Sequence, residues 1–303
     1  DHLSRKGIAV LRFDDRGVGS SGGEFGTATS EDFTTDALAG VEYLEDQGRI
    51  ATNRVGIVGH SEGGLIGPLA AIQSEKIAYI VMLAGPGIPG IDILVAQGQL
   101  INRAAGAPEA VVEMNARVQR TLADIAKEEN DLEKAGPRMR SAMREEIALL
   151  PQAIKELIPE SQINDVAINA MANQFNSPWF RFFLHYDPRP VLEQVSVPVL
   201  AIFGEKDLQV PHELNVPEIE AALQRGNNED ATVRVLPGLN HLFQQAESGA
   251  PSEYQQIEET FNQSALELVS SWILEQFATP KAGTLNQPLY RPVSYLTSSY
   301  TGF

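Results

Sequence analysis

The pentapeptide Gly59-His60-Ser61-Glu62-Gly63 is the segment of the chain best suited to chemistry. It follows a short β-branched run at residues 55–58 and precedes a helix-like segment at residues 65–72. In this setting Gly-x-Ser-x-Gly predicts a sharp strand-to-helix turn, a nucleophile elbow, that presents the serine hydroxyl at the end of a sheet. The first N–H groups of the helix would face a developing oxyanion. We predict Ser61 as nucleophile and the Glu62 backbone N–H as oxyanion donor; an ordinary buried turn serine is the alternative.

A serine hydroxyl is un-ionised at neutral pH, so it needs a base, and the base needs an orienting acid. Histidine, with an unperturbed pKa of roughly 6.5, suits the first task. Asp207 follows a predicted strand at residues 197–203, and His241 follows another at residues 231–236. Ligands of open α/β sheets bind at the carboxyl ends of the strands, where these groups would meet Ser61. We predict His241 as general base and then acid, and Asp207 as the carboxylate that fixes its tautomer.

Other residues compete for these roles. His60 adjoins the serine, but the turn directs neighbouring side chains apart, so we expect it to be structural. The remaining rival bases are His212, His185 and His2, and the rival acids are Glu205 and Asp187. For His241 itself the alternative is a surface-loop histidine. No His, Asp or Glu cluster has the spacing of metal ligands, so no metal is expected.

The elements needed to position these residues alternate along the chain. Apolar β-branched runs predict the strands, and apolar residues at helical spacing predict the helices. The strands are expected at residues 8–13, 55–58, 77–83, 197–203 and 231–236, and the helices at residues 30–47, 65–72, 214–225 and 260–277. This order predicts an α/β protein with a mainly parallel sheet covered by helices on both faces.

A long helical block interrupts that alternation. Residues 91–168 are rich in Ala, Glu, Arg and Leu and carry two amphipathic stripes, which favour packing surfaces. We expect residues 1–90 and 190–278 to form the core, residues 91–189 a helical cap inserted over the strand ends, and residues 279–303 an irregular tail. The Gly-rich stretch at residues 17–23 lacks the third glycine of a dinucleotide-binding turn.

Aromatic residues gather where the helical block rejoins the sheet. Trp179, Phe180 and Phe183 belong to this run. Aromatic side chains commonly line ligand clefts, so we expect part of the run to form an acyl or alcohol pocket. Simple packing of the block on the core is the alternative.

Composition excludes several classes of partner. The 303 residues carry a formal net charge of −17, which opposes binding to nucleic acid and to anionic membrane surfaces. No apolar run approaches the roughly 18 residues of a membrane span, and no signal peptide is visible. A cytoplasmic location is therefore favoured, with export left open. The chain has no cysteine, which removes disulfides and thiolate chemistry.

Together these motifs resemble the α/β-hydrolase superfamily and, within it, bacterial serine carboxylesterases with a Gly-His-Ser-Glu-Gly-Gly elbow. The resemblance covers roughly residues 3–276. Its further pieces are Phe13-Asp14-Asp15-Arg16-Gly17-Val18-Gly19-Ser20, Leu83-Ala84-Gly85-Pro86-Gly87, Ser177-Pro178-Trp179-Phe180, Gly204-Glu205-Lys206-Asp207 and Leu239-Asn240-His241. It implies hydrolysis of short- to medium-chain acyl esters through an acyl-enzyme, without a cofactor. The partner expected is a small-molecule ester, with a homo-oligomer left open.

One departure from the superfamily pattern concerns the N-terminal part of the fold. In the superfamily, two or three strands and a first helix precede the strand expected at residues 8–13, and the loop before that helix donates the second oxyanion N–H. We expect these pieces to be missing here. Thioester hydrolysis or acyl transfer on the same triad, and a truncated non-catalytic binding protein, are the alternative functions.

Overall fold

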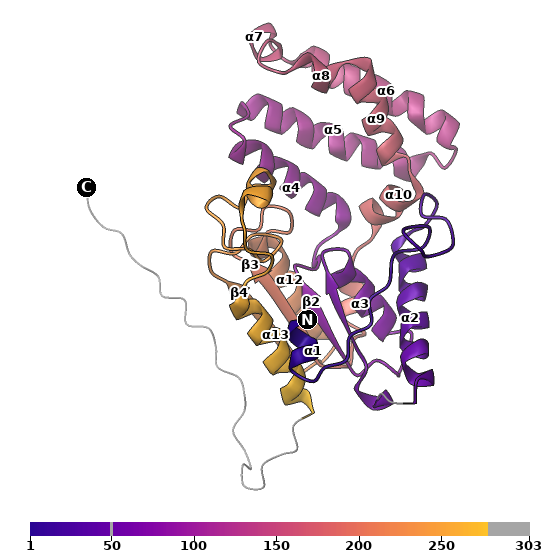
Figure 1. The fold of residues 1–303 in the computed structure, drawn as a ribbon. Helices are drawn as coiled ribbons and strands as arrows, with labels where there is room; N and C mark the ends of the chain where they lie inside the picture. The colour runs from indigo at the N-terminus through magenta and orange to yellow at the C-terminus, as the bar shows by residue number, and fades with distance from the viewer. Residues whose placement is uncertain (49–50, 278–303) are drawn as a thin grey trace, which may run out of the picture.

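A computed structural model describes residues 1–48 and 51–277 of the chain. The tail expected to be irregular, residues 279–303, lies outside the described residues. Figure 1 shows a sheet wrapped by helices, with a separate group of helices beyond one of its ends. None of the described helices combines the length and the apolar character needed to cross a bilayer.

The sheet has four strands in the order β1-β2-β3-β4, and every neighbouring pair is parallel. The strands are β1 (Gly56–His60), β2 (Tyr79–Leu83), β3 (Val199–Gly204) and β4 (Ala231–Leu236). His60 is in register with Leu83, and Gly204 with Leu236. The carboxyl-terminal residues of the strands therefore lie at the same end of the sheet, as the sequence predicts for an open α/β fold.

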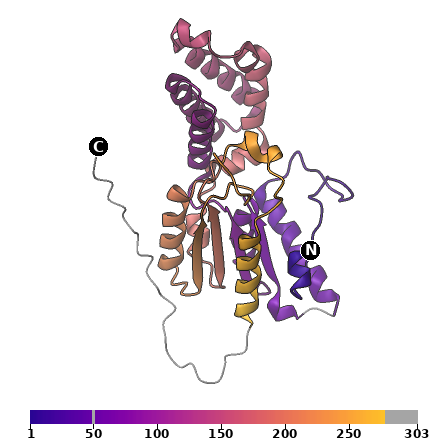
Figure 2. The ribbon, with the colours of Figure 1, turned by 60° about the vertical axis from the view of Figure 1, so that its left-hand side comes forward.

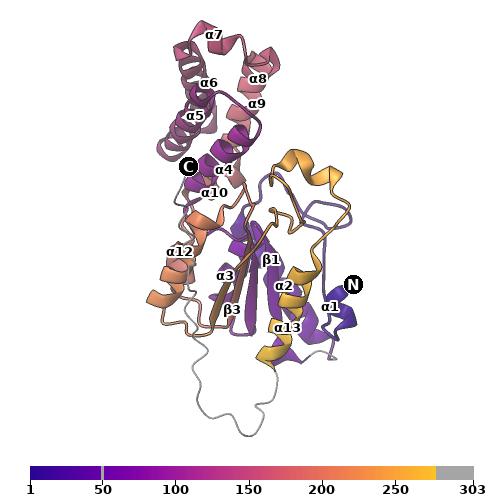
Figure 3. The same cartoon turned by 90° about the vertical axis from the view of Figure 1, so that its left-hand side faces the viewer.

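Helices cover both faces of this sheet, as predicted. One face carries α2 (Ser30–Asp46), α3 (Gly63–Ala71) and α12 (His212–Arg225), and the other carries α13 (Gln263–Gln276) with α1 (His2–Arg5) packed beside it. Figures 2 and 3 show α12 and α13 on opposite sides of the strands. Two short 3₁₀ turns, Thr52–Arg54 and Pro251–Gln256, complete the core.

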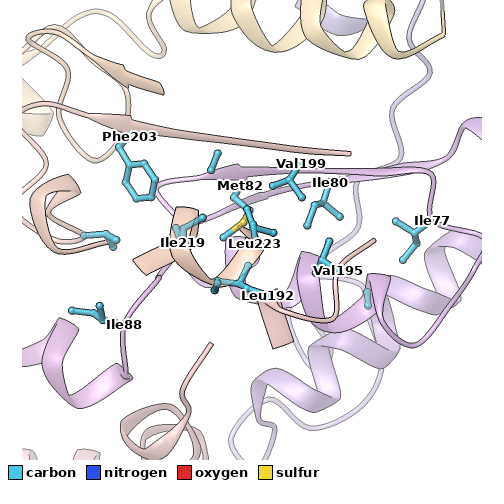
Figure 4. Packing of buried hydrophobic residues seen from close by; sticks show 14 of the residues in the cluster. Ile77, Ile80, Met82, Ile88, Leu192, Val195, Val199, Phe203, Ile219 and Leu223 are labelled. Atoms are coloured by element: carbon cyan, nitrogen blue, oxygen red, sulfur yellow. The ribbon is translucent and has the colours of Figure 1, made fainter. Parts of the chain in front are cut away.

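Alternation along the strands builds two separate apolar layers. Ile80 and Met82 point to the face covered by α12, where they join Ile219 and Leu223 (Figure 4). The intervening Val81 points to the opposite face, against α13. Strands buried on both faces read as continuous apolar runs, which is why residues 77–83 could be recognised without a polar–apolar alternation.

The helical block forms a unit with a core of its own. Its elements are α4 (Gly90–Ala104), α5 (Glu109–Glu128), α6 (Leu132–Leu149), α7 (Gln152–Lys155), α8 (Glu160–Ile163), α9 (Asp165–Phe175) and α10 (Pro178–His185). Leu122, Met139 and Leu184 are among its fully buried side chains. The short helix α11 (Arg189–Leu192) packs instead on α12 and α3, and its Leu192 belongs to the core of the sheet. Figure 3 shows α5 to α9 beyond the end of the sheet, with α10 and α4 between them and the strands.

The strand predicted at residues 8–13 is wrong. The structure leaves this segment without strand pairing, and Val10 and Phe13 are 48% and 52% exposed. In the described part of the chain β1 pairs only with β2, and a groove of about 440 Å³ separates its free edge from residues 11–13. An apolar β-branched run reports a tendency to be buried, but a strand also needs a neighbouring backbone to bond with.

The Gly-rich loop after residue 13 is anchored to α2 by one arginine. Arg16 Nε donates to Asp36 at 2.8 Å and Arg16 Nη1 donates to Asp32 at 3.0 Å, so its guanidinium spans two carboxylates. These bonds raise the pKa of Arg16, the Asp36 hydrogen bond most of all. Gly17 takes a φ of +74°, a backbone conformation that favours glycine. The ion pairs of Arg16 thus attach this loop to the first turns of α2.

Candidate active site

Ser61 occupies the turn between β1 and α3 with a left-handed backbone, φ +54°. A non-glycine residue in this region is uncommon and marks a site where the surrounding structure imposes strain. A Cβ at Gly59 would collide with the carbonyl oxygen of Gly63, and one at Gly64 would press on the Gly85 backbone. The glycines therefore permit the close approach of strand and helix that the sequence predicts for this turn.

The backbone around Ser61 leaves a donor available. The Ser61 N–H is used, since it donates to the Leu83 carbonyl at 2.8 Å. The next N–H, that of Glu62, donates to no acceptor in the described part of the chain. It lies at the N-terminus of α3, where helix N–H groups favour negative charge.

His241 and Asp207 meet at the carboxyl end of the sheet. His241 Nδ1 lies 2.8 Å from Asp207 Oδ2, and both side chains are almost fully buried. The other carboxylate oxygen of Asp207 accepts the backbone N–H groups of Gln209 and Val210 at 2.8 and 2.9 Å. With Nδ1 bonded to a carboxylate, Nε2 is left as the proton-accepting nitrogen. Among the described residues no protein group is hydrogen bonded to His241 Nε2, Ser61 Oγ included.

Asn240, which sequence reasoning missed, shapes the loop that carries His241. Asn240 is completely buried, and its Oδ1 accepts the N–H groups of Leu242 and Gln244 at 3.0 and 2.9 Å. Its Nδ2 donates to Gln244 Oε1 at 3.0 Å. The signal was present in the sequence, because asparagine commonly bonds to the backbone two residues on and so closes a turn.

His60 has a structural role in the geometry observed. Its Nε2 lies 2.8 Å from the His241 carbonyl oxygen, and the two imidazole rings are 4.7 Å apart. Packing around the ring lowers the pKa of His60, although part of the residue remains accessible to solvent. The neutral ring that donates from Nε2 therefore ties the end of β1 to the His241 loop.

The other histidines lie in different surroundings. His212 begins α12 and is 3.3 Å from its neighbour Glu213. His2 is bonded to Ser270 of α13 at 3.1 Å. His185 ends α10, where burial, and then nearby positive charge, lowers its pKa. None of these three makes the bond to a buried carboxylate that His241 makes.

The rival carboxylates are committed elsewhere. Glu205 accepts the N–H of Gly238 at 2.7 Å in the loop before His241. Asp187 forms a paired bond with the Arg189 guanidinium, 2.7 Å at the closest, which lowers the pKa of Asp187. Their observed partners give both carboxylates structural roles.

The aromatic run reaches the serine turn through one residue. Trp179 Nε1 donates to Glu62 Oε1 at 2.6 Å, and Glu62 is the residue that follows Ser61 in the sequence. Its ring stacks on Phe183, with centroids 5.1 Å apart and planes 6° from parallel. Phe180 meets the Trp179 ring edge-on, with centroids 5.1 Å apart, and also packs against Phe175 in the core of the helical unit. The structure thus brings Trp179 to the candidate site and places Phe180 in packing.

Comparison with known proteins agrees with this architecture. Residues 1–251 match the model of the alpha/beta hydrolase family. Esterase EstD of Thermotoga maritima is 26% identical over 256 residues, which cover 83% of this chain and 50% of the relative. The chain therefore spans about half the length of this curated relative.

Solved structures were also found to be similar. The Pyrococcus furiosus esterase Pf2001 is 18% identical, with a TM-score of 0.48 over 90% of this chain and 73% of that one. A monoacylglycerol lipase of Paleococcus ferrophilus is 17% identical, with a TM-score of 0.44 over 90% and 86% of the two chains. The family match extends over the greater part of the sequence, from α1 through the Ser61 turn to the His241 loop. The chain belongs to the alpha/beta hydrolase family.

Proposed function

We propose that the protein is a serine carboxylesterase that hydrolyses short- to medium-chain acyl esters. The observation that carries the proposal is the buried hydrogen bond between His241 Nδ1 and Asp207 Oδ2, 2.8 Å long. It lies at the carboxyl end of the strands, where Ser61 adopts a left-handed backbone conformation. A histidine oriented by a carboxylate, near a serine on a strand-to-helix turn, is the arrangement that activates a weak hydroxyl nucleophile. The resemblance to EstD, described as an esterase, supports the ester as substrate.

In the proposed reaction Ser61 Oγ attacks the ester carbonyl carbon while its proton passes to His241 Nε2. The tetrahedral intermediate places its oxyanion on the Glu62 N–H. The C–O bond breaks, and the alcohol leaves with the proton from His241. Water then attacks the acyl-enzyme, giving its proton to His241, and the carboxylic acid is released as Ser61 recovers that proton. Asp207 stabilises the imidazolium in both halves of the cycle.

The helical unit is proposed as a cap that selects the acyl group. The support is the position of α10, whose Trp179 bonds to the residue after Ser61 and stacks on Phe183. Phe180 contributes packing in this proposal, so Phe183→Ala is expected to alter the preferred acyl length more than Phe180→Ala does. Comparing kcat/KM of both variants across an ester series tests this assignment.

Hydrolysis of p-nitrophenyl esters from acetate to palmitate, by the parent chain and by Ser61→Ala, tests the proposed function. We expect turnover of the shorter esters by the parent and none above background by the variant. Labelling by a serine-directed phosphonate should follow the same pattern. A folded parent that neither turns over esters nor takes the label would overturn the proposal and favour a non-catalytic member of the family.

A further inference from the structure

We propose that the Glu62 side chain is a positioning residue that fastens helix α10 to the nucleophile turn, an inference that rests on the proposed esterase function for its kinetic consequences. Its backbone N–H is the proposed oxyanion donor. The carboxylate has a separate task, which is to hold three elements together behind that donor.

The contacts of the carboxylate define the fastening. Glu62 Oε1 accepts two hydrogen bonds, from Trp179 Nε1 at 2.6 Å and from Ser30 Oγ at 2.7 Å. Trp179 belongs to α10, Ser30 begins α2, and Glu62 itself precedes α3. One oxygen atom therefore joins the helical unit, the core helix α2 and the turn that carries Ser61.

Each of the two donors, Ser30 and Trp179, is also held by contacts within its own part of the fold. Ser30 is completely buried, and α2 begins with a capping box in which Thr29 and Asp32 bond to each other's backbone. Trp179 is fixed by its stacking on Phe183, whose carbonyl would block any Cβ at Gly90, the first residue of α4. The bond to Glu62 thus links two segments that are each held by other contacts.

The chemistry of the bonds suits a fastening. In the described part of the chain Glu62 forms no ion pair with lysine or arginine. The side-chain hydrogen bonds that its carboxylate accepts come from two neutral donors, Ser30 and Trp179. Hydrogen bonds to an ionised acceptor are roughly twice as strong as bonds between neutral groups. A pair of them can hold a tryptophan edge without the entropy cost of ordering a long cationic side chain.

The consequence for catalysis follows from the position of Glu62. A displacement of about 1 Å at a reacting group can cost on the order of 100-fold in rate. If α10 is released, the Glu62 peptide loses its support, so the oxyanion donor and the Ser61 hydroxyl are both less well placed. We therefore expect a loss in kcat, with a smaller change in KM.

Four variants test the kinetic part with p-nitrophenyl butyrate: Glu62→Ala, Glu62→Gln, Trp179→Phe and the double variant Glu62→Ala/Trp179→Phe. Glu62→Ala should lower kcat about tenfold or more, as expected for a lost charge-assisted bond. Glu62→Gln keeps an acceptor oxygen for both donors and should restore most of that loss. Trp179→Phe keeps the ring stacking and removes only the N–H, so its effect and that of Glu62→Ala should not add in the double variant.

A matched control separates this contact from a general loss of charge. Glu193→Ala removes an exposed carboxylate that pairs with Arg225 at 2.7 Å, far along the chain from the turn, and should leave kcat unchanged. Additive losses in the double variant, or a Glu62→Gln variant as slow as Glu62→Ala, would overturn the proposal.

Tryptophan fluorescence tests the fastening without relying on activity. The chain has two tryptophans, so Trp272→Phe leaves Trp179 as the single reporter. In that background Glu62→Ala should make Trp179 more accessible to quenching by acrylamide, and Glu62→Gln should not. Unchanged quenching in Glu62→Ala would show that α10 is not held by this bond. An inactive parent with the expected quenching would contradict the proposed esterase while leaving the fastening in place.

Discussion

At Ser61 the backbone conformation that presents the hydroxyl also destabilises the fold. The left-handed φ of +54° brings the hydroxyl to the turn, but for an L-residue with a Cβ this conformation costs on the order of 1–2 kcal/mol. Strain of this kind persists only where the neighbouring packing imposes it, here the close contact between the Gly59 and Gly63 backbones. Ser61 is therefore placed at the expense of stability.

Replacement of Ser61 by glycine should stabilise the fold. Glycine adopts positive φ without the Cβ penalty, whereas Ser61→Ala retains it. We expect Ser61→Gly to have a higher free energy of unfolding than Ser61→Ala, by about 1 kcal/mol at most because glycine also gains entropy when unfolded. Urea unfolding of the two variants measures the difference. Equal midpoints and slopes would contradict the idea that the turn is strained.

Asp207 should affect activity by fixing the orientation and tautomer of the His241 ring. Asp207→Asn can still accept the N–H groups of Gln209 and Val210, so the loop should fold, but its amide favours the wrong tautomer of His241. We expect kcat to fall by about 10³–10⁴-fold with little change in melting temperature.

Asp187→Asn is the matched comparison for Asp207→Asn, because Asp187 pairs with Arg189 at the start of α11. It should stay within about tenfold of the parent, since a surface ion pair contributes 0–1 kcal/mol or so. Equal losses in the two variants would contradict the role given to Asp207.

At the scale of elements, the two glycines of the pentapeptide have unequal tasks. A Cβ at Gly59 would overlap the Gly63 carbonyl, while one at Gly63 would meet nothing within 4 Å. Gly59→Ala should therefore lower the free energy of unfolding by about 1–3 kcal/mol, the usual range for overpacking. Gly63→Ala should leave it within about 1 kcal/mol, since alanine suits a helix. Thermal or urea unfolding distinguishes them, and equal destabilisation would contradict the packing described.

Much of the core could be predicted from local pattern. The strand predicted at residues 231–236 has the observed bounds of β4, and the helix predicted at residues 30–47 from its apolar spacing is α2. The carboxyl ends of the strands also suggested which residues would gather, and the structure brings His241 to Asp207. These features depend on neighbours in sequence or on a general rule of parallel sheets.

The features that sequence reasoning missed depend on contacts between distant residues. Residues 8–13 have the composition of a strand, but only the fold shows that no described strand lies beside them. Glu62 and Trp179 are 117 positions apart, and no periodicity links them. The helical unit has its own core, yet α4 and α10 also bring Ile93 and Phe183 to the core of the sheet, contacts that the amphipathic stripes do not specify.

For the whole molecule, β1 is an edge strand of the sheet that the described residues form. Val58 is 41% exposed on this strand, and unpaired backbone groups at an edge invite pairing with another chain. We expect the protein to self-associate through this edge, a tendency that the net charge of −17 opposes without blocking a local contact.

Val58→Lys should weaken that association, because a lysine on an edge strand disfavours strand pairing. Sedimentation velocity over a range of concentrations measures the effect. Leu149→Lys, which alters a side chain 74% exposed at the end of α6, is the control and should behave like the parent. If both variants associate as the parent does, the contact lies elsewhere on the surface.

The insertion of the helical unit between β2 and β3 also bears on how the chain acquires its structure. Pairing Leu83 with Ile202 closes a loop of more than 100 residues, and the entropy cost of closure grows with loop length. Helices α5, α6 and α9 contact one another over short sequence separations, and local contacts of this kind form quickly. Early collapse of the helical unit would draw the two strands together, so the segment that lies beyond the end of the sheet would also act as a folding nucleus for it.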